Sequence, residues 1–318
     1  MNSSRPPPRT VRSDLFAHEQ PLCCFVLLPP DEAPAVALTV TESGCHVFIE
    51  KHGANSSAAL REVAAAAEAR GVQTACGYLW RNHPLTRETQ RLLREGVLGE
   101  VWAWEARIIT TSIADRLAGA ATSQGAVAPV GGAPWLFERA RSGGGILFWL
   151  ASHYLDWILF VLQQDVVEVS AILARRTDAF ADVEDVASVS LRMREGAIGT
   201  VHAGYITPAG FRHKDDGYWA LQGTRGDLRW SPSQRKMTVR SNHAVWSAEP
   251  EREYVYDADT GIGYGGFNGQ DFFRDILQAF ATNCPPLVTL RDAARVLTVF
   301  EAAYQSAATG RTVAVIPE

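Results

Sequence analysis

The sequence lacks the features that would place a protein on a nucleic acid, in a membrane or outside the cell. It has no block of basic residues, and its net charge is −5, so neither a nucleic acid nor an anionic membrane is expected as a main partner. The five cysteines form no C-x-x-C pair and no spacing typical of a metal site. They indicate reduced thiols, no bound metal and a cytoplasmic protein. Residues 1–14 lack the apolar stretch of a secretory signal, and we expect them to be a disordered tail.

A glycine-rich turn for a pyrophosphate is also missing from the predicted strand–helix junctions. A dinucleotide-binding sheet needs G-x-G-x-x-G at a helix N-terminus and an acidic residue about 20 positions later. The glycines between Gly261 and Gly269 fall in a predicted loop late in the chain. Only some twenty residues precede the first predicted strand, too few for a further βαβαβ unit. We therefore predict that the chain binds no dinucleotide.

Residues 15–98 show the alternation of strands and helices that is typical of a parallel sheet. Apolar runs of strand length occupy Leu22–Leu28, Cys45–Ile49 and Val72–Gly77, as expected for strands buried on both faces. Helices are predicted between them over 31–42 and 56–70, the second closed by Gly71. A truncated Rossmann-like domain is the fold class that this pattern predicts.

From Gly99 the hydrophobic period changes to two, which indicates a second domain over 99–318. Its predicted fold is α+β, with an open and mostly antiparallel sheet that is larger than the first. Residues 118–133 are rich in Gly and Ala, and we expect a mobile loop there. Helices are expected at about 267–282 and 290–310, and a short strand at 312–316. The last helix could pack back on the first domain. The predicted strands of this sheet cover 101–108, 188–194, 198–206, 218–222 and 227–230.

The stretch from Gly143 to Asp156 is the most unusual in the chain. Three glycines lead into an apolar run that extends to Leu162, so a permissive turn enters a buried helix rather than a membrane span. Trp149, His153 and Asp156 stand at i, i+4 and i+7 and share one helix face. Two interpretations remain open: a core helix whose histidine is satisfied by Asp156, or a helix that carries an active site.

Several motifs together resemble one family, that of glucose-fructose oxidoreductase, inositol dehydrogenase and MocA (Gfo/Idh/MocA). They run in order over nearly the whole chain and comprise Glu50-Lys51, Gly77 to Pro84, Leu98 to Val101, Gly143 to Asp156, Gly196 to Thr200 and Ala302 to Arg311. The resemblance implies a Rossmann domain joined to an α+β domain whose sheet often makes a dimer. It also implies NAD(P)-dependent chemistry on sugars, cyclitols and related alcohols, with Lys51 and His153 at the family's lysine and helix-histidine positions.

The chain departs from this family in the residues that would hold the dinucleotide. The family's usual Thr-Pro-Asn is replaced by Leu28-Pro29-Pro30, and its common helix aspartate by Trp149. Our first hypothesis is therefore a non-redox enzyme, of lyase, isomerase or cyclase type, acting on a hydroxylated or carbonyl-bearing small molecule without a cofactor. Lys51 would be its acid, base or oxyanion stabiliser and His153 the counterpart, oriented by Asp156. Two alternatives are an NAD(P)-dependent oxidoreductase of a sugar-like substrate with an atypical cofactor site, and a non-catalytic subunit that pairs with an intact homologue.

Four further residues are candidates for substrate binding. Trp149 could line a pocket for a flat or apolar ligand or simply pack in the core. Arg81 precedes a helix and could bind a polar or anionic group, while Tyr154 and Tyr264 are possible hydroxyl donors. The expected partners are the small-molecule substrate and a second copy of the chain, joined as a homodimer through the sheet of the C-terminal domain.

Overall fold

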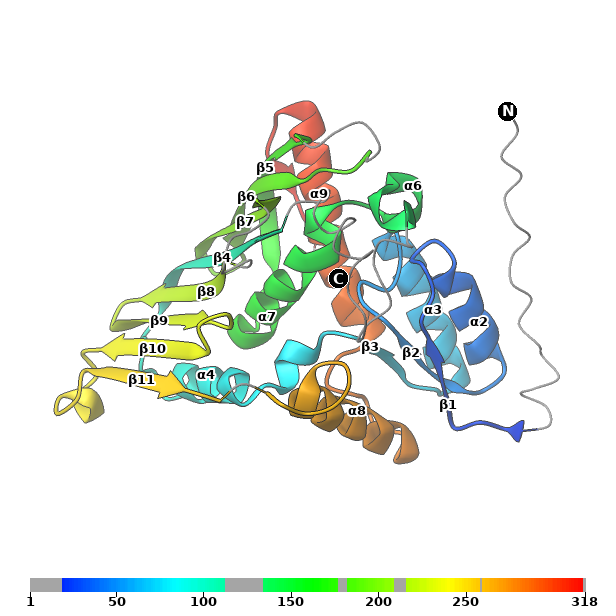
Figure 1. Cartoon of the computed structure of the whole chain (residues 1–318), viewed down its shortest axis with the longest axis horizontal. Coiled ribbons are helices and arrows are strands. Elements are labelled where there is room, and N and C mark those ends of the chain that lie inside the picture. The colour runs from blue at the N-terminus through cyan, green and yellow to red at the C-terminus, as the bar shows by residue number, and fades with distance from the viewer. Residues whose placement is uncertain (1–18, 112–133, 177–181, 209–215, 258, 317–318) are drawn as a thin grey trace.

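The chain folds around two β-sheets that are joined by helices running between them (Figure 1). The computed structural model describes residues 19–111, 134–176, 182–208, 216–257 and 259–316. The predicted tail over 1–14 and the loop predicted over 118–133 lie outside these residues. The predicted fold class is confirmed: a small parallel sheet precedes a larger, mostly antiparallel one.

The small sheet has three parallel strands in the order β1-β2-β3. They are β1 (Cys23–Val26), β2 (His46–Ile49) and β3 (Thr74–Cys76). Helices α2 (Ala33–Glu42) and α3 (Ser57–Arg70) form the connections. The side chain of Ser56 accepts a hydrogen bond from the backbone N–H of Ala59, and Gly71 ends α3 in the left-handed conformation. These local signals explain why both boundaries of α3 could be predicted.

The large sheet has nine strands in the order β11-β10-β9-β8-β4-β7-β6-β5-β12. Only β4 and β7 pair in parallel; the other neighbours are antiparallel. Three of its strands, β5, β10 and β11, were not predicted. The strands are β4 (Val101–Thr111), β5 (Val166–Ala174), β6 (Val186–Met193), β7 (Ile198–Thr207), β8 (Asp216–Gly223), β9 (Gly226–Ser231), β10 (Lys236–Ser241), β11 (Glu251–Val255) and β12 (Val313–Ala314).

Helices α7 and α9 join the two sheets. The helix α7 (Ser152–Leu162) packs against β4 of the large sheet, and α9 (Leu290–Thr309) contacts α3 and β3 on one side and β5 on the other. The predicted return of the last helix to the first sheet is thus seen (Figure 1). The remaining helical segments are η1 (Leu79–Asn82), α4 (Pro84–Arg94), η3 (Pro134–Phe137), α6 (Arg139–Ser142), the π-helical turn η4 (Leu147–Ala151), η5 (Ala244–Trp246) and α8 (Gly266–Ala281).

The apolar run that begins at Gly145 forms the π-helical turn η4 followed by α7. Among the described residues, the stretch Arg139–Leu162, which contains α6, η4 and α7, is the one long and apolar enough to span a bilayer. Within its apolar window, 78% of the residues are buried inside the fold. The run is therefore a core helix of a globular protein, as predicted.

Candidate functional site

Lys51 follows the carboxyl end of β2 and turns its side chain toward the glycine-led helix. The Lys51 Nζ atom donates a hydrogen bond of 2.6 Å to the backbone oxygen of Trp149 and lies 3.7 Å from the centre of the Trp149 ring. Lys51 is only 8% exposed. A carbonyl dipole and an aromatic face both favour an ammonium ion, so they hold this amine at a fixed position between the two sheets.

The glycines before η4 bring this helix close to its neighbours. A Cβ on Gly145 would lie 1.9 Å from the backbone oxygen of Glu184, and one on Gly144 would lie 2.1 Å from the hydroxyl of Tyr304. The Glu184 carboxylate accepts hydrogen bonds from the backbone N–H groups of Gly145 (2.9 Å) and Leu147 (3.0 Å) and from the Tyr304 hydroxyl. Glycine is thus required here for close approach, and a buried carboxylate caps the free N–H groups at the start of the helix.

His153 lies one helical turn beyond Trp149, and the charge of Lys51 acts on the pKa of its imidazole. Its ring meets that of Tyr78 edge-on, with centroids 5.5 Å apart, and its Nδ1 is buried with no partner among the described residues. Burial, together with the neighbouring Lys51 and His52, lowers the pKa of His153 well below its ordinary value. A neutral imidazole can donate or accept one hydrogen bond to a hydroxyl group, so His153 suits the binding of an alcohol rather than the donation of a proton.

A second histidine, His52, was not predicted as part of this region. It is fully buried, and its Nε2 lies 2.7 Å from the backbone oxygen of Ser142. Burial, with the charge of Lys51, lowers the pKa of His52 to about 3. The neutral ring therefore donates to Ser142 and ties the segment after β2 to the end of α6. The sequence shows that His52 follows Lys51, but no local pattern predicts that its side chain is buried.

The side chains of Glu50, the neighbour of Lys51 in the sequence, and Tyr264 meet. The Tyr264 hydroxyl lies 3.5 Å from Oε1 of Glu50, and Tyr264 comes from the loop before α8. Burial raises the pKa of Glu50 to about 7, although Lys51 and the bond from Tyr264 act in the opposite direction. Tyr264 thus lies next to Glu50, the residue before Lys51 in the Glu50-Lys51 motif.

The predicted pairing of Asp156 with His153 is wrong. Both carboxylate oxygens of Asp156 accept hydrogen bonds from Arg81: Nε lies 3.0 Å from Oδ2, and a terminal nitrogen lies 2.6 Å from Oδ1. Arg81 also contacts Asp292 at 3.3 Å and the backbone oxygen of Leu287 at 3.1 Å. Asp156 and Arg81 are both buried, so the two form an internal ion pair instead of serving a histidine and a ligand.

Tyr154 does not reach the site either. It lies on the side of α7 that faces the large sheet, where its ring stacks on Trp219 with centroids 4.4 Å apart. A Cβ on Gly217 of β8 would lie 2.2 Å from the Tyr154 hydroxyl, which shows how tightly the two elements pack. Because His153 and Tyr154 are consecutive in the sequence, their side chains point to different faces of the helix.

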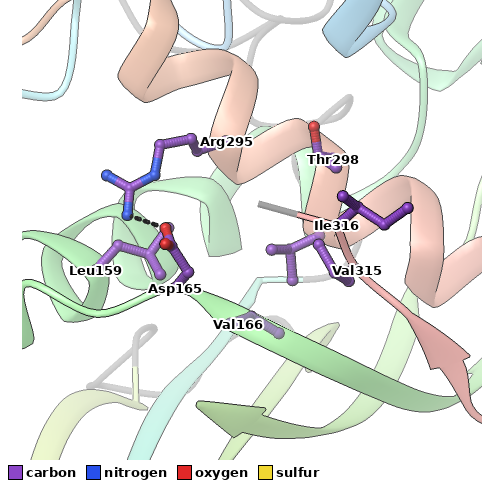
Figure 2. Close-up of a pocket in the computed structure, with 8 residues that line it drawn as sticks. Leu159, Asp165, Val166, Arg295, Thr298, Val315 and Ile316 are labelled. Carbon is purple, nitrogen blue, oxygen red and sulfur yellow. Dashed lines mark hydrogen bonds and ion pairs between the residues drawn. The ribbon is translucent and has the colours of Figure 1, made fainter. Parts of the chain in front are cut away.

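A small cavity lies away from these residues, between the end of α7, α9 and the last strand (Figure 2). Its volume is about 20 Å³, which suffices for about one water molecule. An ion pair between Arg295 and Asp165 closes one side, as the dashed line in Figure 2 shows. None of the candidate site residues contributes to its lining, which consists of Leu159, Asp165, Val166, Arg295, Thr298, Val299, Val315 and Ile316.

Known proteins match part of this chain in sequence and nearly all of it in structure. The family model of the GFO/IDH/MocA C-terminal domain matches residues 86–229. Among curated proteins, 1,5-anhydro-D-fructose reductase of Ensifer adhaerens is 27% identical over 192 residues, which is 60% of this chain and 51% of that protein. Levoglucosan dehydrogenase of Pseudarthrobacter phenanthrenivorans is 20% identical over 289 residues, 76% of this chain and 68% of that protein. The match thus spans about half the length of the first of these relatives.

Solved structures match over more of the chain. GenD2 from gentamicin A biosynthesis, in complex with NAD, has a TM-score of 0.74 and 26% identity, and the match covers 97% of this chain and 82% of that one. Levoglucosan dehydrogenase in complex with NADH and levoglucosan has a TM-score of 0.78 and 19% identity, covering 92% and 80%. The chain thus shares the fold of these oxidoreductases. Its residues 86–229 match the C-terminal domain of the Gfo/Idh/MocA family, the family that its motifs resemble.

These matches correct the predicted function. The hypothesis of a non-redox lyase, isomerase or cyclase is contradicted, because the relatives are a reductase and a dehydrogenase and the solved structures include complexes with NAD and NADH. They agree with the alternative, an NAD(P)-dependent oxidoreductase. The idea of a degenerate cofactor site has no support from them.

The described residues fit one end of a dinucleotide site better than the other. The Lys51 amine and the Nδ1 atom of His153, which has no partner among the described residues, would suit an alcohol bound beside a nicotinamide. The turn between β1 and α2 instead contains Asp31 and Glu32, whose carboxylates pair with Arg141 at 2.9 and 2.7 Å. Two carboxylates at a helix start disfavour a pyrophosphate, so the phosphates would be held by residues other than these.

Proposed function

We propose that this chain is an NAD(P)-dependent oxidoreductase that acts on a sugar or a related cyclic alcohol. The observation that carries the proposal is the hydrogen bond from the Lys51 amine, at the carboxyl end of the small sheet, to the backbone of Trp149, one helical turn before His153. The Lys51 charge also contributes to the lowered pKa of His153. Relatives named for the reduction of 1,5-anhydro-D-fructose and the oxidation of levoglucosan support it. The dinucleotide would supply the acceptor or donor of hydride.

In this proposal Lys51 and His153 act on the same substrate hydroxyl in two different roles. The Lys51 amine exchanges the proton of the substrate oxygen, since it lies at the end of β2 with its position fixed by the Trp149 carbonyl. His153, held neutral by burial, orients the same oxygen through one hydrogen bond. The Trp149 ring, half-buried beside Lys51, provides an apolar wall against which the carbon face of a pyranose can pack.

Purified full-length protein would test the proposal in two steps. With nine tryptophans in the chain, quenching of intrinsic fluorescence reports the binding of NADH or NADPH. Nicotinamide absorbance then measures turnover with 1,5-anhydro-D-fructose, levoglucosan and a panel of aldoses and cyclitols. We expect Lys51→Met to abolish turnover while binding persists. The matched control is Lys236→Met, which removes a lysine that pairs with Glu253 on β10 and β11. Absence of both binding and turnover in the wild-type protein would contradict the proposal.

We also propose that the chain forms a homodimer through the open face of its large sheet. Ile172, Ile198 and Ile206 point outward from β5 and β7, with 78%, 54% and 43% of their surface exposed. Exposed isoleucines on one sheet face are costly in water and favour an interface. Sedimentation of the wild-type protein beside an Ile172→Glu/Ile198→Glu variant tests this: the variant should be a monomer, and a monomeric wild type would contradict the proposal.

A further inference from the structure

One residue, Glu184, accepts hydrogen bonds from three consecutive backbone N–H groups at the start of the glycine-led helix. Its carboxylate oxygens accept those of Gly145 (2.9 Å) and Leu147 (3.0 Å), and its backbone oxygen accepts that of Ile146 (3.2 Å). The first N–H groups of a helix have no partner within the helix itself. Glu184 is only 7% exposed and stands two residues before β6. It therefore fastens the first turn of this helix to the large sheet.

Tyr304 of α9 holds the Glu184 carboxylate in place. Its hydroxyl accepts a hydrogen bond from the Gly145 N–H (3.2 Å) and donates one to Oε2 of Glu184. Each of these partners donates to the carboxylate, so both of its oxygens must act as acceptors. A Cβ on Gly144 would lie 2.1 Å from the Tyr304 hydroxyl. The glycine therefore leaves the space that this hydroxyl occupies.

The turn that Glu184 fastens also carries the two groups that hold the Lys51 amine. The Trp149 N–H donates to the backbone oxygen of Gly145 (3.0 Å), so the position of Trp149 follows from that of the glycine. The Trp149 backbone oxygen lies 2.6 Å from Lys51 Nζ, and the centre of its ring lies 3.7 Å from the same atom. A continuous series of hydrogen bonds thus runs from Tyr304 through Glu184 to the amine.

We propose that Glu184, held by Tyr304, is the positioning residue of the Lys51 amine. The inference rests on the proposed oxidoreductase function, in which this amine exchanges a proton with the substrate oxygen. Such an amine must lie within hydrogen-bond reach of that oxygen, and a displacement of about 1 Å can cost about a hundredfold in rate. Because Glu184 bonds three N–H groups of the turn before Trp149, it limits this displacement.

Two substitutions loosen this attachment to different degrees. Glu184→Gln keeps the shape of the side chain but replaces one acceptor oxygen with an amide donor, so the bond from Gly145 or from Leu147 is lost. Tyr304→Phe removes the hydroxyl and leaves the ring in place. It is the milder change, and it keeps the test open if Glu184→Gln does not fold.

The matched control is Glu301→Gln on the same helix, α9. The Glu301 carboxylate accepts hydrogen bonds from the N–H and the hydroxyl of Ser57 at the start of α3, at 2.7 and 2.6 Å. The variant therefore also weakens a helix start, but that of a helix that does not carry Trp149. Any effect of a lost helix cap on stability alone should appear in this variant as well.

The Trp149 ring reports the position of the amine without any turnover. Protons that lie over the face of an aromatic ring resonate at higher field, so the Hε protons of Lys51 should be displaced upfield from those of the other lysines. The sequence has three lysines, so NMR of protein labelled with carbon-13 lysine resolves them, and Lys51→Met assigns the signal. We expect Glu184→Gln to lose most of the displacement and Tyr304→Phe to lose part of it, whereas Glu301→Gln should keep the wild-type value.

In turnover of a sugar, kcat should fall by about tenfold or more in Glu184→Gln and by less in Tyr304→Phe. KM should rise less than kcat falls, because the Trp149 ring is still present. Glu301→Gln should keep the wild-type kcat.

Three results would overturn the proposal. The first is a Lys51 signal at its wild-type position in both variants, or in Tyr304→Phe alone if Glu184→Gln does not fold. The second is an unchanged kcat in a variant whose signal has moved, and the third is an equal loss in Glu301→Gln. If the signal moves as expected but the wild-type protein turns over no sugar, the positioning of the amine stands and only the proposed function fails.

Discussion

Arg81 and Asp156 form a buried ion pair that links the small sheet to the helix of the proposed site. Arg81 lies in η1, just after β3, and Asp156 lies one turn beyond His153 in α7. Three hydrogen bonds of 2.6 to 3.2 Å join the two side chains, of which 5% and 0% are exposed. The pair ties η1, which follows β3 of the small sheet, to α7, which carries His153. It therefore acts on the site through position and not through contact with a substrate.

Asp156→Asn should destabilise the protein strongly, because among the described residues it leaves the buried charge of Arg81 with Asp292 as its one carboxylate partner. Breaking a buried pair costs about 3–5 kcal/mol of unfolding free energy. We expect a loss of about 3 kcal/mol, at the lower end of this range, because Asp292 still pairs with Arg81. Urea denaturation followed by tryptophan fluorescence measures it. The control is Asp271→Asn, which breaks an exposed pair with Arg274 on α8 and should cost less than about 1 kcal/mol. Equal losses in the two variants would contradict this role.

The sequence was sufficient to predict the frame of the molecule and part of the site. Gly71, Ser56 and the spacing of apolar residues are local signals, and they placed α3 within a residue. Lys51 and His153 were found from motifs. The contacts that position them were not, because the bond from Lys51 to the Trp149 carbonyl spans 98 positions and that from Arg81 to Asp156 spans 75. No local pattern encodes contacts of such separation. Strand β11 was missed because its alternating residues Glu251 and Glu253 are exposed and charged, so the hydrophobic period is weak.

Gly145→Ala should be far more damaging than an alanine at a glycine with open space. A Cβ at position 145 would lie 1.9 Å from the Glu184 carbonyl oxygen, so the start of η4 must move and the N–H bonds to the Glu184 carboxylate must break. We expect a loss of several kcal/mol, in the upper range of single substitutions at about 4 kcal/mol. Gly44→Ala is the control: nothing lies within 4 Å of its Cβ, and only its φ of +77° opposes alanine, at about 1–2 kcal/mol. Thermal unfolding of both variants decides the matter, and similar melting temperatures would count against the close approach.

Trp149 should affect the substrate more than the fold. Trp149→Ala removes the ring 3.7 Å from Lys51 Nζ but keeps the backbone oxygen that accepts its hydrogen bond. The amine loses about 1–2 kcal/mol of ring contact, and the substrate loses its apolar wall, so we expect KM to rise by about tenfold and kcat to fall less. Trp149→Phe keeps an aromatic face and should lie between. Steady-state kinetics with the best substrate gives both constants; a change confined to kcat would contradict the proposed wall.

Buried neutral histidines should make the protein less stable in acid. The pKa of His52 is lowered to about 3, whereas an unfolded histidine titrates near its ordinary value of about 6.5. Between these values the unfolded chain binds one proton more than the folded chain at this residue, so stability is complete above pH 6.5 and is lost as pH falls toward 3. His153 acts in the same direction, since its pKa is also lowered. Asp156, whose pKa burial raises to about 6, opposes the trend between about pH 4 and 6.

His52→Gln isolates the contribution of one ring, because glutamine can still donate a hydrogen bond to the backbone oxygen of Ser142. Below pH 6.5 the free energy of unfolding of the wild-type protein should fall more steeply than that of the variant, by about 1.4 kcal/mol per pH unit. Above pH 7 the difference between the two should be constant, which serves as the internal control. Urea denaturation between pH 5 and 8 measures both slopes. Parallel curves over the whole range would mean that His52 is charged in the folded protein or exposed in it, and the hydrogen bond of 2.7 Å to Ser142 would then have to be a bond from an imidazolium ion.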